Sequence, residues 1–206
     1  MCVLKILNIE CLDYEYLINN KITILKECEV KYNNDGSFNR LQITNEYLNK
    51  LDFKTINKET IKNIKKQKGL TYKIEETNNN IIIDKKTSKE YSFSKSSQRL
   101  DLNDKKIKLI LSKYLKEIIN NSSYRKFVNY KKKKHIKDAK FGFYKYKITF
   151  SIINKNIENI YEATVLIRND ANTKKYLYDI LNIKKLTNPA SEPWIINIGA
   201  SCACVN

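Results

Sequence analysis

The chain has 206 residues, of which 42% are hydrophobic, a length and composition typical of one folded domain with an elaborated end rather than of a disordered segment. Lys and Arg number 39 against 22 Asp and Glu, which gives a formal net charge of +17. No run approaches the ~20 apolar residues of a membrane span. No basic region followed by an apolar run opens the chain, so we expect no secretory signal.

The positive charge is concentrated in one part of the sequence. Residues 1–50 carry six basic and seven acidic side chains, whereas residues 105–150 carry fifteen basic and two acidic ones. A field concentrated in this way attracts polyanions. We therefore expect nucleic acid as the partner; a solvated basic face and an anionic membrane surface are the alternatives.

The five cysteines are an odd number and sit at the two ends of the chain, as Cys2, Cys11, Cys28, Cys202 and Cys204. This arrangement is not a disulfide framework and fits reduced thiols, so we expect a cytoplasmic protein. Cys202 and Cys204 lack a second pair at ligand spacing, and the sequence therefore predicts no metal site. Phosphate-binding and dinucleotide-binding glycine motifs are absent as well, and no cofactor is expected.

The first 94 residues alternate between predicted strands and short predicted helices. Apolar runs before and after the turn at 33–36 predict a β-rich extension over residues 1–45. Short helices are expected at 46–51 and at 58–68, the second capped by Asn57 and stopped by Gly69. The alternating runs 71–76, 80–84 and 90–94 then predict a small antiparallel meander.

The strongest helix signal lies at residues 105–119. Its apolar residues recur with a period of 3.6 at Ile107, Ile110, Leu111, Tyr114, Leu115 and Ile118. Its lysines, Lys108 among them, fall largely off this stripe and are expected to stay in water.

Three strands are predicted after the helix, near 142–153, 161–168 and 175–183. Alternation places Tyr144, Tyr146, Ile148, Phe150 and Ile152 on one face of the first. The other face is expected to stay open, carrying Lys145, Lys147, Thr149, Thr164 and Arg168. The predicted fold is thus α+β: a curved antiparallel sheet covered on one face by a long amphipathic helix, with the N-terminal β-rich extension. The expected domains are the extension 1–45, an α+β domain over 46–186 and a tail over 187–206.

Residues 74–185 resemble a known family. The segments are IIIDKKTSKEYSFSK, YLKEIINNSSYRK, FGFYKYKITFSI and YEATVLIRNDANTKKYLYDILNIKK. They resemble a large polyvalent-protein-associated domain of phage and mobile-element proteins, linked to the barnase, EndoU, colicin and RelE-like ribonuclease superfamily. The resemblance implies helices packed on a curved antiparallel sheet, RNA as substrate, and an immunity or antitoxin protein as a partner.

A metal-independent ribonuclease needs an acid, a base and cations around the phosphate. His135 is the only side chain that titrates near neutrality without perturbation, and it follows the lysine run 131–134. Arg168 ends a predicted strand, where its planar fork could clamp a phosphate, and Tyr178 could donate a proton. The alternatives are a surface histidine, an arginine paired with Asp170 or Asp179, and a core tyrosine.

Aromatic and basic residues also interleave between positions 124 and 147. Rings that stack on bases, alternating with cations that meet phosphates, are typical of single-strand binding. The predicted RNA-binding residues are Tyr124, Arg125, Lys126, Tyr130, Lys131, Lys132, Lys133, Lys134, Lys145 and Lys147, with Phe127 as a further ring. Residues 122–140 are expected to form a loop.

Three functions remain open from the sequence. The first is a metal-independent RNase-like toxin or effector domain acting on RNA. The second is a non-catalytic nucleic-acid-binding accessory domain, and the third is a phage structural or head-associated protein. Cleavage of RNA would separate the first from the other two.

Overall fold

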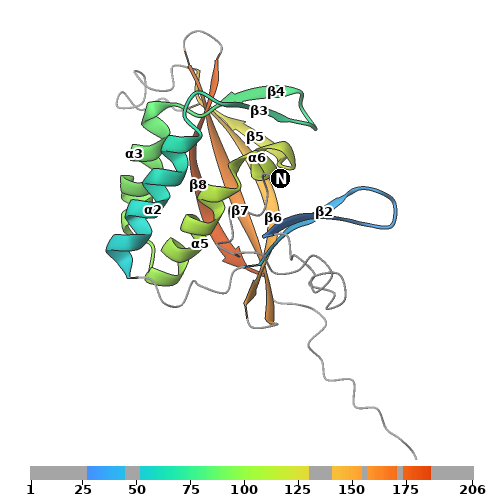
Figure 1. Ribbon diagram of the computed structural model, residues 1–206. Coiled ribbons are helices and arrows are strands. Elements are labelled where there is room, and N and C mark those ends of the chain that lie inside the picture. The colour runs from blue at the N-terminus through green and yellow to red at the C-terminus, as the bar shows by residue number, and fades with distance from the viewer. Residues whose placement is uncertain (1–26, 45–51, 130–140, 155–156, 171–173, 187–206) are drawn as a thin grey trace, which may run out of the picture.

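The computed structural model describes residues 27–44, 52–129, 141–154, 157–170 and 174–186 (Figure 1). The predicted helix 46–51 and the tail 187–206 lie outside these ranges. The strands are β1 (Cys28–Tyr32), β2 (Phe38–Thr44), β3 (Thr71–Ile74), β4 (Asn79–Ile82), β5 (Ser123–Val128), β6 (Phe143–Asn154), β7 (Ile157–Asn169) and β8 (Lys175–Lys185). The helices are α2 (Phe53–Lys66), α3 (Lys85–Phe93), α4 (Lys95–Gln98), α5 (Leu102–Lys113) and α6 (Leu115–Asn120).

The strands form one curled sheet in the order β1-β2-β6-β7-β8-β4-β3, with β5 paired to β6. The three strands predicted in a row are β6, β7 and β8, and their antiparallel pairing is confirmed. The sheet as a whole is mixed, because β2 runs parallel to β6 and β4 runs parallel to β8. The prediction of a purely antiparallel sheet is therefore wrong at both of these junctions.

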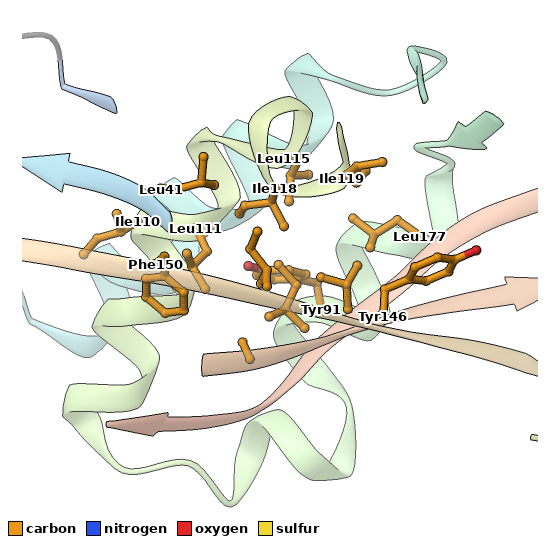
Figure 2. Close-up of a cluster of buried hydrophobic side chains, with 14 of the residues drawn as sticks. Leu41, Tyr91, Ile110, Leu111, Leu115, Ile118, Ile119, Tyr146, Phe150 and Leu177 are labelled. Carbon is orange, nitrogen blue, oxygen red and sulfur yellow. The ribbon is translucent and has the colours of Figure 1, made fainter. Parts of the chain in front are cut away.

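One face of β6 and β7 is apolar, as the alternation predicts. Tyr146, Ile148 and Phe150 of β6 are fully buried, and Ala163 and Val165 of β7 join them in the same core. Figure 2 shows side chains from the sheet and from the helices meeting in this cluster. The ring of Tyr146 reaches out of the cluster, with its hydroxyl at the outer end (Figure 2).

Several helices cover this face. The prediction of one long helix over residues 105–119 is wrong. Figure 1 shows α2, α3 and α5 on one side of the sheet. The predicted helix is divided into α5 and α6 at Tyr114, whose backbone has φ −114° and ψ 34°. The side-chain amide of Gln67 in the turn after α2 donates to the Ser112 carbonyl at 2.8 Å. That carbonyl would otherwise bond the next helical turn, so a contact from another helix favours the break.

The N-terminal half follows the prediction except at three points. The hairpin β1–β2 and the antiparallel pair β3–β4 lie where strands were expected. Helix α2 starts before the predicted position, because Asp52 rather than Asn57 caps it by accepting from the backbone N–H of Thr55. The third run of the meander is not a strand but the end of α3, which a capping box between Asp84 and Thr87 initiates.

The third point concerns the position of the expected N-terminal extension, residues 1–45, relative to the rest of the sheet. The described part of the expected extension, β1 and β2, adds to the edge of the sheet through β6, and Leu41 and Ile43 of β2 are fully buried in the main core.

Within the described ranges, none of the helices is long and apolar enough to cross a membrane.

Candidate nucleic-acid interface

Strand β5 occupies part of the region where the sequence predicts a loop. It pairs with β6 alone among the described strands, so it forms an edge of the sheet. Every residue from Ser123 to Phe127 is exposed. The strand forms because its aromatic residues find cross-strand partners on β6, which the lysine-rich sequence around it does not indicate.

Two rings of β5 are anchored on one side and open on the other. The Tyr124 ring makes an edge contact with Tyr146 at a centroid distance of 5.7 Å, and Phe127 lies 4.9 Å from Tyr144. Tyr124 remains 42% exposed and Phe127 41% exposed. Rings held in this way lose little conformational entropy when a ligand stacks on them. Both rings lie on the face that also carries the core.

The other face of the paired strands β5 and β6 carries two lysines that lie directly opposite each other. Lys126 and Lys145 are direct cross-strand partners, so their side chains lie on the same face. Neither ammonium makes a hydrogen bond or ion pair with any described residue. The partner of Lys145 on β7 is Leu166, which supplies no compensating charge. Like charges directly opposite destabilise a sheet, and a bound anion would remove that repulsion.

Lys147 and Arg125 extend the positive surface along β6 and β5. Lys147 pairs with Glu162 of β7 and keeps 29% of its side chain exposed. Arg125 is exposed at the bulge between Tyr124 and Lys126, and no described residue pairs with its guanidinium. Four of the predicted RNA-binding cations, Arg125, Lys126, Lys145 and Lys147, are therefore brought together with Tyr124. We call Tyr124 to Phe127, Lys145 and Lys147 the β5–β6 ribbon.

A further cation lies beside the aromatic side of the ribbon. Lys175 of β8 places its Nζ 5.4 Å from the centroid of the Tyr144 ring and donates to the Asn79 side chain. Asn79 in turn donates to the Tyr146 hydroxyl at 3.0 Å. This chain of contacts connects β8, β4 and β6 next to the exposed rings. The sequence does not indicate Lys175 or Asn79, because no local pattern relates positions 79, 146 and 175.

Arg168 does not lie on an open face, and that prediction is wrong. The residue is 3% exposed. Its guanidinium pairs with Asp84 at the start of α3 and lies 4.6 Å from the centroid of the Tyr176 ring. Asp84 lies 84 positions away from Arg168 in the sequence, and the sequence does not indicate it as a partner. A residue enclosed in this way joins β7 to the helical layer.

Tyr178 packs in a small second cluster on the side of the sheet away from the main core. Its ring meets Phe143 edge-on at 5.1 Å, and Leu166 and Leu181 complete the cluster. Phe143 is 2% exposed and Leu166 8%, so this end of the predicted open face is covered. This position agrees with the alternative in which Tyr178 is a packed tyrosine rather than a proton donor.

A buried ion pair between α5 and β8 is the main polar feature that the sequence did not predict. Lys108 was expected in water but is 4% exposed. Its Nζ donates to Asp179 at 2.6 Å, to the Ser97 hydroxyl at 2.7 Å and to the Tyr91 carbonyl at 3.1 Å. Burial lowers the pKa of Lys108, an effect that the attraction of Asp179 opposes. Burial likewise raises the pKa of Asp179, against the lowering effect of Lys108.

The remaining predicted residues, Tyr130, Lys131 to Lys134 and His135, lie outside the described residues. Within the described ranges, no group of three or more His, Cys, Asp or Glu side chains could hold a metal ion. Comparison of the chain with family models, with curated proteins and with solved structures finds no match.

Proposed function

We propose that this protein binds single-stranded nucleic acid along the β5–β6 ribbon, with RNA as the preferred form. The observation that carries the proposal is the pair Lys126 and Lys145, which face each other across β5 and β6 without a counter-charge. Strand β5 also exposes Tyr124 and Phe127. Phosphates supply the missing negative charge, and unpaired bases supply flat apolar faces for the rings.

The two faces of the ribbon, one with rings and one with lysines, suit a single strand of nucleic acid better than a duplex. The rings lie on one face of β5 and the opposed lysines on the other, and β5 is an edge. A flexible single strand can follow this edge with its bases on the rings and its phosphates at the cations. A duplex keeps its bases stacked inside, and therefore gains nothing from the rings.

We propose binding rather than cleavage as the activity of this surface. Arg168, which the sequence placed at the phosphate, is enclosed and paired with Asp84. The β5–β6 ribbon carries no histidine, and its titratable groups are lysines, an arginine and a tyrosine. These groups hold anions and stack bases, which suffices for a binding module. The ribonuclease alternative is retained as an outcome of the experiment.

The test is fluorescence anisotropy with a labelled 12-nucleotide oligouridine over a series of salt concentrations. We expect log Kd to rise linearly with log salt, because each neutralised phosphate releases counterions. Lys126→Gln together with Lys145→Gln should reduce the slope by about 0.7 for each lost contact. Replacing Tyr124 and Phe127 by alanine should cost about 1–3 kcal/mol for each stacked base.

The matched control is Lys58→Gln with Lys66→Gln, two exposed lysines of α2. This variant removes the same charge from a surface away from the ribbon, so its salt slope should equal that of the wild type. Equal losses in both lysine variants would mean that the whole basic surface attracts polyanions without a site, and the proposal would fail. Gel analysis of the RNA after each titration detects cleavage, which would favour the ribonuclease alternative.

A further inference from the structure

A polar pocket lies beside the ribbon, where two strands share one edge of β6. Strand β5 pairs with β6 as far as Lys147, and β2 pairs with it from Phe150 onward. Between these two strands is a cavity of about 360 Å³. Ligand pockets in proteins measure about 300–1,000 Å³, so this one has room for a group the size of a base with its sugar.

The pocket carries both signs of charge. Glu75 and Glu76, which follow β3, supply carboxylates, and Arg125 and Lys147 supply cations. Neutral hydrogen-bonding groups come from the junction of α6 and β5, at Asn120, Asn121, Ser122 and Ser123. A simple anion would be repelled by the two carboxylates. The lining instead fits a ligand that has N–H donors at one end and a phosphate at the other.

Glu76 is the acceptor that the fold holds in place. One of its carboxylate oxygens, Oε2, accepts from the backbone N–H of Tyr124. Its other oxygen, Oε1, accepts no hydrogen bond from any described residue. The side chain is thus fixed at the start of β5 with one oxygen left to bind a donor. Arg125, the next residue after Tyr124, reaches the same cavity, so the pocket is continuous with the ribbon.

We propose that this pocket takes one guanine base of the single-stranded RNA, read by the Glu76 carboxylate. The inference rests on the proposed function of the β5–β6 ribbon. Guanine presents two adjacent donors, N1–H and N2–H, to which a carboxylate can bind. Uracil has a single N3–H between two carbonyl acceptors, which repel a carboxylate. Adenine and cytosine have an amino donor, but the ring nitrogen beside it is an acceptor and also repels a carboxylate. Arg125 and Lys147 then meet the phosphate that follows the base.

The experiment compares oligouridine 12-mers in which one central position is uridine, guanosine or inosine. We expect the guanosine oligonucleotide to bind about 10-fold more tightly than oligouridine, within the range for a bidentate base contact. Inosine keeps N1–H but lacks the amino group, so its affinity should fall between the two. Glu76→Gln should abolish the preference for guanosine and leave the affinity for oligouridine unchanged apart from the effect of net charge.

The matched control is Glu59→Gln, which changes the net charge equally at a residue of α2. It should retain the guanosine preference and calibrate the charge effect on oligouridine binding. Oligouridine binding without any gain from guanosine, or a gain that persists in Glu76→Gln, overturns the base pocket while leaving the ribbon intact. Absence of oligouridine binding at low salt overturns the proposed function and the pocket with it.

Discussion

The charged residues of this protein occur in two contrasting environments. Lys108 and Arg168 are enclosed, and each has an acidic partner from a distant part of the chain, Asp179 and Asp84 respectively. Lys126 on the edge strand β5 faces Lys145 on the neighbouring strand β6, and neither has such a partner among the described residues. The sequence predicts that all four of these side chains are accessible to solvent.

This contrast indicates which cations of a very basic chain are available to a ligand. Removing an ion from water is unfavourable, and an enclosed cation persists only with a partner and further hydrogen bonds. Lys108 has both, in Asp179 and in the oxygens of Ser97 and Tyr91. Lys126 and Lys145 have no acidic partner among the described residues and repel one another, so a polyanion can bind them without breaking an internal contact.

The largest effect is expected when the enclosed pair is broken. Lys108→Met leaves the Asp179 carboxylate buried without its cation, and should lower the free energy of unfolding by about 3–5 kcal/mol. Urea denaturation measures this value. The double variant Lys108→Met with Asp179→Leu should recover most of the loss, since replacing both partners by apolar groups is often neutral. The control variant Lys126→Met, on the edge strand, should change the free energy of unfolding by less than about 0.5 kcal/mol. A loss equal to that of Lys108→Met would contradict the contrast between enclosed and exposed lysines.

Arg168→Ala should destabilise the protein by about 3 kcal/mol, at the lower end of the range for a broken buried pair, because Asp84 remains 20% exposed and can be partly rehydrated. RNA affinity of the folded fraction should stay at the wild-type value. Thermal denaturation and anisotropy on the same preparation provide the two readings. If the melting temperature is unchanged while RNA affinity collapses, Arg168 belongs to the binding surface after all.

Gly142→Ala tests the packing of β5 against the start of β6. Gly142 has φ +89°, and a Cβ there would lie 2.5 Å from the backbone oxygen of Val128. We expect a loss of about 1–3 kcal/mol, with weaker RNA binding because β5 must move. Gly36→Ala is the control, since its φ is +79° but a Cβ would meet nothing within 4 Å. The control should cost less and leave RNA binding intact.

The smallest effect on stability comes from reversing one edge charge. Lys126→Glu places a carboxylate opposite Lys145, which should stabilise the sheet by about 0.2–1 kcal/mol relative to the lysine pair. The same change removes a phosphate contact and adds repulsion, so RNA binding at moderate salt should be largely lost. Chemical denaturation and anisotropy would show stability and affinity moving in opposite directions. A variant that is less stable, or that binds as before, would show that the repulsion between the two lysines is unimportant.

Local periodicity in the sequence predicts which faces of the central strands are apolar. In β6 and β7 a period of two leaves one face rich in Tyr, Ile and Val, and those side chains are buried in the core or packed against it. In the apolar stripe from Ile107 to Ile118 every residue except the half-buried Tyr114 is also buried, although the helix is divided. Burial of apolar surface depends on local periodicity, which a linear sequence displays directly. The interleaved rings and cations of β5 were likewise visible as a pattern.

The pairing of distant residues depends on the folded structure. Asp84 with Arg168, Asp179 with Lys108 and the Gln67 contact that divides the helix all join positions at least 45 residues apart. The opposition of Lys126 and Lys145 depends on strand register and on a bulge between Tyr124 and Lys126. Periodicity states which side of an element is apolar, but a register is fixed only when strands pair across the chain. For that reason the sequence predicted the ribbon's residue types, and the fold determined which of its charges remain open to RNA.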